Sequence, residues 1–283
     1  MEFENPEIPE GINVSDEHPL KSLTQLVLGS LAVIAIALIV LHYSVQYLVQ
    51  YIPFEFEVEM TEHIDFLDSE KSELSSLGLS KQKELQALAD ELSVNMQLPE
   101  GMKITVHYSN EDIVNAFATL GGHVFIYQGL LDTLKSEQAL SMVMAHEIAH
   151  IQLRHPINSL GKGVALLTLG AVITGATGSS AGESLINSSS NLSLMKFSRD
   201  QESHSDLLAA HAIQAYYGNI AGAEDLFNSF EELAVEKTVT IFSSHPHSDN
   251  RWKALADKAA KHNWLVDGDL QAIPDTLLQK DSN

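Results

Sequence analysis

The sequence predicts an α+β fold that is mainly α-helical, with one small antiparallel sheet and a single transmembrane helix in front of it. Residues 22–54 contain no Asp, Glu, Lys or Arg, which is typical of a membrane-spanning segment. Short segments within 103–128 alternate or are rich in β-forming residues, as strands are. The longer segments around them carry apolar residues at helical spacing.

The composition limits what the chain does. Its 283 residues include 38 Asp and Glu against 16 Lys and Arg, a formal net charge of -22. Nucleic-acid binding is therefore not expected, because contacts to phosphates need clusters of Lys and Arg. The absence of cysteine excludes disulfides and thiolate metal ligands. The length fits one sizeable domain with accessory segments.

The N-terminal part is predicted to anchor the chain in a lipid bilayer. Residues 1–22 are rich in Glu, Pro, Asn and Asp and are expected to form a disordered acidic tail. Residues 23–51 are the predicted transmembrane anchor, since a helix of about 20 residues spans about 30 Å. The segment lacks the basic start and the cleavage site of a signal peptide, so we expect an uncleaved anchor. A belt of aromatic side chains is expected at its end: Tyr43, Tyr47 and Tyr51.

The flanking charges predict the orientation of this single-pass anchor. Lys21 is the only nearby base and lies on the N-terminal side, whereas Glu55 and Glu57 follow the apolar segment. Because basic residues favour the cytoplasmic side, the following domain is predicted to be extracytoplasmic. In a Gram-negative bacterium this would be the periplasm.

An acidic connector at 52–79 is predicted to lead into a domain at 80–265. A helix capped by Ser80 and ending near Met96 opens this domain. Three strands should follow, and the turn at Gly121-Gly122 predicts that the last two pair antiparallel. The predicted strands are Lys103–Tyr108, Val114–Ala118 and His123–Gln128.

Residues 136–156 form the segment around which the domain is organised. Ser136 is the expected N-cap of a helix, and Pro156 marks its end. Within it, His146 and His150 lie four residues apart, so both imidazoles reach one metal ion from one helical face. Glu147 lies about 100° around the helix and is placed to act as a base on a water molecule. The histidines on the strands, His107 and His123, are interpreted as ordinary strand side chains.

A catalytic zinc ion usually has three protein ligands, so a third ligand is needed. The pattern with a third histidine requires Gly and His where this chain has Leu153 and Pro156. His155 is interpreted as a cation at the helix C-terminus. A glutamate from a later helix remains, and Glu202 lies on a well-patterned helix near 191–217. The sequence thus predicts one zinc ion per chain, held by His146, His150 and Glu202.

Two further side chains are expected beside this metal site. Asp206 lies one turn after Glu202 and is placed to accept the free N–H of a metal-bound imidazole. Arg199 is the expected ion-pair partner of these acids. An alternative is that Glu202 and Asp206 form only a solvated helix face.

The rest of the domain is predicted from composition and periodicity. The apolar segment Gly163–Ala176 is either a buried helix or a segment that dips into the membrane surface, and 175–190 is a Gly/Ser-rich loop. Further helices are expected at 220–235 and from about Arg251 to His262. Residues 266–283 are predicted to be a loosely packed polar tail.

Several motifs, in this order along the chain, resemble the HtpX/CAAX-prenyl-protease family of membrane zinc metallopeptidases. They are Asn115-Ala116-Phe117-Ala118, Gly121-Gly122-His123-Val124-Phe125, His146-Glu147-x-x-His150, Glu202-x-x-x-Asp206 and Ser244-His245-Pro246. The resemblance covers about 80–262 and implies a zincin-like (gluzincin) metallopeptidase fold that cleaves polypeptides. With one predicted transmembrane segment, the chain looks closer to single-anchored relatives that degrade or trim damaged membrane and envelope proteins.

The resulting hypothesis is a zinc-dependent metalloendopeptidase with Glu147 as general base. His245 is the candidate donor to the developing oxyanion, with Asn115 as the alternative. His245 is equally consistent with a helix-start turn or with a ligand that caps zinc in a resting state. Substrate is expected to pair with an exposed strand edge formed by Phe125, Ile126 and Tyr127. The alternative functions are a catalytically silent, chaperone-like scaffold at the membrane and a structural protein with a closed metal site.

Overall fold

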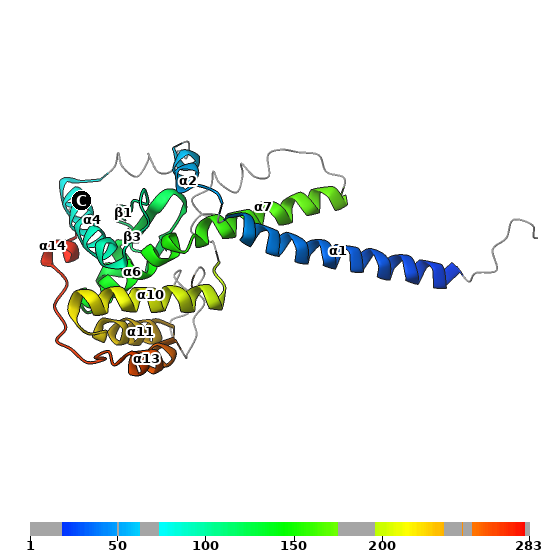
Figure 1. The fold of residues 1–283 in the computed structure, drawn as a ribbon. Helices are drawn as coiled ribbons and strands as arrows, with labels where there is room; N and C mark the ends of the chain where they lie inside the picture. The colour runs from blue at the N-terminus through cyan, green and yellow to red at the C-terminus, as the bar shows by residue number, and fades with distance from the viewer. Residues whose placement is uncertain are drawn as a thin grey trace, which may run out of the picture. The chain divides into compact units, whose positions relative to one another are not determined.

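The computed structural model describes residues 19–49, 51–62, 74–174, 196–234, 245 and 251–280. The chain divides into two compact units, 1–44 and 45–283. The first contains most of helix α1, Pro19–Val49 (Figure 1). Within α1, Leu20–Leu41 is long and apolar enough to cross a membrane and is not buried. Most of the predicted N-terminal tail, 1–18, lies outside the described residues.

The sheet has three strands, β1 (Thr105–Ser109), β2 (Ala116–Ala118) and β3 (His123–Tyr127), in the order β1-β3-β2. β2 and β3 pair antiparallel, but β1 pairs parallel with β3. The prediction of a purely antiparallel sheet is therefore wrong. Alternation along a strand specifies its faces but not its neighbour, and β1 pairs with β3 instead of with β2.

The turn between β2 and β3 requires glycine. It is a short 3₁₀ helix, η2 (Leu120–Gly122), in which Gly121 and Gly122 have φ values of 69° and 86°. A Cβ atom on Gly122 would lie 2.0 Å from the carbonyl oxygen of Lys103. Glycine at this position therefore permits both the left-handed backbone and the close approach of the chain.

The central position of β3 contradicts the predicted substrate edge. Phe125 and Ile126 are completely buried and Tyr127 is 8% exposed. Both edges of β3 are already hydrogen-bonded, one to β1 and the other to β2. A substrate strand cannot add to Phe125, Ile126 and Tyr127, because no backbone groups of β3 face an open edge.

Helices cover this sheet. α4 (Ser76–Met96) packs against β1 through an apolar face that includes Leu85, Ala89 and Leu92. Its N-cap is Ser75, which accepts a hydrogen bond from Gly78 N at 2.9 Å; the prediction of Ser80 as the cap is wrong. The short helix α5 (Gln128–Thr133) follows β3 directly.

The central helix is α6 (Glu137–Gln152), which is buried along almost its whole length between β2, α4, α10 and α11. Ser136 caps it as predicted, accepting from Ala139 N at 3.1 Å. α6 ends before Pro156, because Arg154 adopts a left-handed backbone (φ 58°) and α7 (His155–Thr174) begins directly after it.

Residues of the predicted connector form part of the folded domain. α2 (Phe54–Thr61) buries Phe54 and Glu57 against the η2 turn. Glu57 Oε1 accepts from Arg154 Nε at 2.6 Å, and its Oε2 accepts from Gly121 N at 3.3 Å. Burial raises the pKa of Glu57, although Arg154 acts against that shift. Residues 63–73 lie outside the described part of the chain.

The C-terminal half contributes α10 (Arg199–Tyr217), α11 (Ala221–Ala234) and α13 (Arg251–His262) (Figure 1). Beyond them, the tail that was expected to pack loosely is docked. Ile273 and Leu277 are buried, and a short helix, α14 (Asp275–Leu278), packs against α4 and α5. α7 covers most of Gly163–Ala176. The structure does not describe the side chains of 165–174 or any part of 175–195. Whether Gly163–Ala176 is buried in the domain or dips into the membrane surface therefore stays a prediction.

Candidate metal centre

Two histidines of α6 and one glutamate of α10 bring their side-chain atoms together. His146 and His150 lie one turn apart, and their Nε2 atoms are 3.0 Å apart. Glu202, in the first turn of α10, places Oε2 3.5 Å from His146 Nε2 and Oε1 3.4 Å from His150 Nε2. All three side chains are buried. The residues predicted as metal ligands are thus neighbours although α6 and α10 are distant in the sequence.

His245 belongs to the same cluster. Its Nδ1 atom lies 3.1 Å from Glu202 Oε1 and 3.3 Å from His146 Nε2. Its Nε2 atom lies 3.4 Å from Glu147 Oε1. One ligand atom from each of His146, His150, Glu202 and His245 lies within 4.8 Å of all the others. The cluster therefore offers four ligand atoms in place of the three that were predicted.

The spacing of these atoms fits one cation. Zinc binds nitrogen and oxygen at about 2.0–2.2 Å, so atoms at two tetrahedral corners lie about 3.3–3.6 Å apart. The separations among His146, His150 and Glu202 are 3.0–3.5 Å, close to that geometry. Buried imidazole nitrogens and a carboxylate that face one another need a proton or a cation between them. The donor set of two histidines and one glutamate is one that catalytic zinc sites use.

Protons balance the charges of the cluster in the metal-free protein. Burial acts to lower the pKa of His146, but the carboxylates of Asp206 and Glu202 outweigh burial and raise it to about 10. Burial lowers the pKa of His150 well below its ordinary value. Burial acts to raise the pKa of Glu202, but His245 and the other two histidines hold it far below the usual range. The cluster thus carries a charged His146 and an ionised Glu202 when no metal is bound.

Asp206 and Arg251 support the cluster from the side of α10 and α13. Asp206 Oδ1 lies 3.0 Å from His146 Nδ1, on the side of the ring opposite to the cluster. Arg251 donates to both carboxylate oxygens of Asp206, at 2.9 Å and 2.6 Å, and its Nη2 lies 3.2 Å from Glu202 Oε2. Burial acts to raise the pKa of Asp206, but Arg251 and His146 lower it to about 2.

The guanidinium beside these acids is therefore Arg251, whereas Arg199 is exposed at the start of α10. Arg251, about fifty positions later in the chain, forms the ion pairs with Asp206 and Glu202 that were expected of Arg199. Arg251 reaches the acids because α13 packs against α10.

Comparison with protein families agrees with this arrangement. The family model of peptidase family M48 matches residues 79–259, which include every side chain of the cluster. The chain belongs to peptidase family M48. The resemblance to the HtpX group of metallopeptidases that the motifs carry is thereby confirmed. The predicted fold class, a mainly helical metallopeptidase domain with a small sheet, is confirmed as well, apart from the parallel pairing of β1 with β3.

Curated relatives of this M48 chain are metalloproteases. It is 26% identical to metalloprotease YcaL of Escherichia coli over 189 residues, 63% of this chain and 70% of YcaL. It is 30% identical to the mitochondrial metalloendopeptidase OMA1 of Saccharomyces cerevisiae over 193 residues, 65% of this chain and 55% of OMA1. It is 29% identical to metalloprotease LoiP of Escherichia coli over 182 residues, 62% of this chain and 69% of LoiP. The matched region thus spans between 55% and 70% of these relatives' lengths.

Two residues of the M48 centre were not identified from sequence. His155 Nδ1 lies 2.9 Å from His150 Nδ1, and Phe197 stacks on the His150 ring with centroids 4.0 Å apart. Burial lowers the pKa of His155 to about 4, and the charge of His146 adds to this shift. The interpretation of His155 as a C-terminal cation is therefore wrong: it begins α7 and is neutral at physiological pH. In the sequence, the one feature that pointed to this contact was the position of His155 five residues after His150.

The remaining candidates of the M48 site differ in how closely they approach the cluster. Glu147 is buried, and its Oε1 atom faces His245 Nε2. Asn115 is buried just before β2, and its side-chain oxygen has no hydrogen-bond partner among the described residues. No hydrogen bond in the described part of the chain joins the Asn115 side chain to the four clustered side chains, so its role as a donor stays a prediction.

Proposed function

We propose that this M48 protein is a membrane-anchored, zinc-dependent endopeptidase that holds its metal with His146, His150 and Glu202. The observation that carries the proposal is the convergence of these three side chains beside the buried carboxylate of Glu147. Zinc bound there would lower the pKa of a water molecule and polarise the carbonyl of the scissile peptide bond.

The residues of the chain supply the other steps. Glu147 takes a proton from the attacking water molecule and delivers it to the leaving amine. Asp206 holds the His146 ring in the orientation in which Nε2 faces His150 and Glu202, and Arg251 holds Asp206 and Glu202 in place. These contacts keep the three ligands preorganised, which metal sites with catalytic function require.

His245 has two candidate roles in this mechanism. The approach of its Nδ1 atom to Glu202 and His146 supports a fourth ligand in the resting protein. The nearness of its Nε2 atom to Glu147 supports a donor to the oxyanion instead. Substitution His245→Ala separates them: loss of a resting ligand raises peptide cleavage, and loss of a donor lowers it on the order of 100-fold.

The proposed substrates are polypeptides of the membrane or the cell envelope, because α1 holds the domain at a bilayer. The peptidase domain is proposed to lie on the extracytoplasmic side of the membrane. This part of the proposal rests only on the charges that flank the apolar helix. A catalytically silent scaffold is less well supported, since a scaffold has no use for a buried base beside a metal site. A closed structural site would require His245 as a permanent ligand.

The test is digestion of casein by the full-length protein in detergent. We expect cleavage with zinc bound, loss of cleavage with phenanthroline, and no cleavage by the Glu147→Gln variant, which keeps its zinc. The matched control is Glu100→Gln, the same change at an exposed position. Substantial turnover by Glu147→Gln would refute the role of Glu147, and no turnover by the wild-type protein would favour the scaffold.

A further inference from the structure

The two nitrogen atoms of the His150 ring face different groups. Its Nε2 atom belongs to the metal cluster, 3.4 Å from Glu202 Oε1 and 3.0 Å from His146 Nε2. Its Nδ1 atom lies 2.9 Å from Nδ1 of His155. His155 is only 6% exposed and belongs to α7, whereas His150 belongs to α6. A buried side chain outside the proposed ligand set thus contacts the far side of a proposed ligand.

We propose that His155 is a positioning residue, which accepts the Nδ1–H of His150 and holds that ring in place as a metal ligand. The inference deepens the proposed function and rests on it. An imidazole that binds a metal through Nε2 keeps its proton on Nδ1, and such N–H groups normally donate to a fixed acceptor. Two ring nitrogens 2.9 Å apart share one proton, so one donates and the other accepts.

The direction of this hydrogen bond follows from the metal site. If His155 Nδ1–H donated to His150 Nδ1, the proton of the neutral His150 ring would be on Nε2, and that nitrogen could not bind a metal. The donor is therefore His150. The acceptor is His155 Nδ1, and the proton of the His155 ring is on Nε2.

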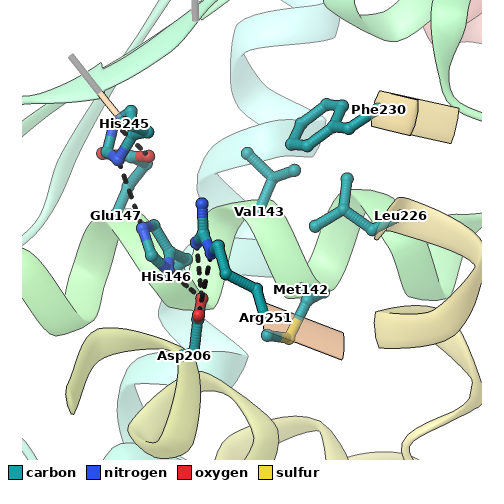
Figure 2. A pocket seen from close by; sticks show the side chains of 9 residues that line it. All are labelled: Met142, Val143, His146, Glu147, Asp206, Leu226, Phe230, His245 and Arg251. Atoms are coloured by element: carbon teal, nitrogen blue, oxygen red, sulfur yellow. Dashed lines mark hydrogen bonds and ion pairs between the residues drawn. The ribbon is translucent and has the colours of Figure 1, made fainter. Parts of the chain in front are cut away.

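The neighbouring ligand, His146, has an equivalent contact of a different kind. Its Nδ1 atom lies 3.0 Å from Asp206 Oδ1 (Figure 2). A carboxylate orients a metal-bound imidazole and adds negative charge behind it, whereas a neutral imidazole orients the ring without adding charge. The site already buries the carboxylates of Glu147, Glu202 and Asp206. A neutral acceptor behind His150 therefore avoids the cost of burying another charge.

The break between α6 and α7 brings His155 to this position. On a continuous helix five residues correspond to about 500°, so residue 155 would lie about 140° around the axis from His150. The chain instead leaves α6, and Arg154 adopts a left-handed backbone with φ 58°. The Arg154 side chain donates to Glu57 Oε1 at 2.6 Å and to the carbonyl of Ile52 at 3.0 Å. These contacts stabilise a turn that residues with a Cβ atom disfavour.

Two buried side chains restrict both rings. Phe197 stacks on His150 with ring centroids 4.0 Å apart, and its centroid lies 5.9 Å from that of His155. Ser205 Oγ lies 3.5 Å from His155 Nδ1. The contact between His155 Nδ1 and His150, at 2.9 Å, is the shorter of these two and therefore the stronger hydrogen bond.

The first test measures the zinc affinity of full-length variants by competition with a chromophoric chelator. His155→Leu removes the acceptor with little change in volume and should weaken zinc binding about 10–100-fold. His155→Asn keeps an oxygen acceptor near the position of Nδ1 and should retain most of the affinity. The matched control is His262→Leu, at an exposed position where the ring lies against His211 and Trp264. Unchanged affinity in His155→Leu, or equal losses in His155→Leu and His155→Asn, would overturn the proposal.

The second test uses the wild-type chain, so it does not depend on whether the variants fold. The protein is produced with isotopically labelled histidine, loaded with an NMR-active cadmium isotope in place of zinc, and studied in detergent. We expect one ring whose Nε2 couples to cadmium and whose Nδ1–H couples across a hydrogen bond to an unprotonated Nδ1 of a second ring. His146 cannot give this signal, because its Nδ1 faces a carboxylate. A proton found on Nδ1 of the second ring, or no coupling between two rings, would contradict the proposal.

These measurements separate the inference from the proposed function. A wild-type protein that binds no zinc contradicts the proposed metal site, and the role of His155 falls with it. A wild-type protein that binds zinc equally well with His155→Leu overturns the role of His155 alone. The expected order of affinities supports that role even if the protein cleaves no casein.

Discussion

The contact between Asp206 and His146 makes a quantitative prediction for the variant Asp206→Asn. The substitution keeps the shape of the side chain but removes the charge that Arg251 and His146 face. In the metal-free protein the pKa of Asp206 is about 2, against an ordinary value of 3.8. At about 1.4 kcal/mol per pKa unit, this shift corresponds to about 2 kcal/mol of the free energy of unfolding at pH 7.

Zinc binding adds a second effect. Groups that orient a metal-bound imidazole typically change metal affinity by about 10–100-fold, or about 1.4–2.7 kcal/mol. At a fixed, saturating concentration of free zinc, this loss of binding free energy adds to the loss of unfolding free energy in the metal-free protein. The zinc-loaded variant should therefore unfold with a free energy lower by about 3–5 kcal/mol than the loaded wild type.

The assay is urea unfolding of both proteins with and without buffered zinc, together with competition for zinc against a chromophoric chelator. Asp200→Asn, at an exposed position in the same helix, is the matched control. The pKa of Asp206 is depressed, so its contribution is full above about pH 3.8 and disappears as pH falls through about 2. Unchanged zinc affinity in Asp206→Asn would refute the idea that Asp206 orients His146.

Three further predictions concern the ligands and the packing behind them. Glu202→Ala should lose zinc, so elemental analysis after desalting should find little metal; full retention would assign the third ligand elsewhere. Because His146 is protonated in the metal-free protein, zinc binding at pH 7 should release a proton, seen by calorimetry in buffers of different ionisation enthalpy. Arg154→Met leaves the Glu57 carboxyl buried without its partner and should lower the free energy of unfolding by about 3–5 kcal/mol. Adding Glu57→Gln should restore part of that loss, and no restoration would show that the pair itself contributes little.

The helix with the two histidines illustrates what short-range patterns determine. The distance between residues four apart on a helix is constant, so His146 and His150 share a face wherever α6 packs. Glu202 and Asp206 share a face of α10 for the same reason. The cap formed by Ser136 is also a local feature, because its hydrogen bond goes to a residue only three positions later. Periodicity also predicted most of the helices, although the ends of several differ by a few residues.

Partners from distant segments could not be predicted in this way. Arg251 replaces Arg199 beside Asp206 because α13 packs against α10, and no local spacing encodes that contact. His155 was interpreted as a cation at the C-terminus of α6, but α7 begins at this residue and places it next to His150. The edge strand was misassigned because the strand-forming residues of Phe125–Tyr127 do not reveal that strands lie on both sides of this segment.

The amino-acid sequence by itself determined the apolar N-terminal helix, the helical character of the domain and the chemistry of the candidate metal ligands. These features depend on composition and on spacings within one helix, which the backbone geometry makes constant. Only the tertiary structure decided that Glu202 and His245 reach the two histidines, that Arg251 supports them, and that His155 lies next to His150. Those arrangements depend on which surfaces are buried together, and burial is a property of the whole folded chain.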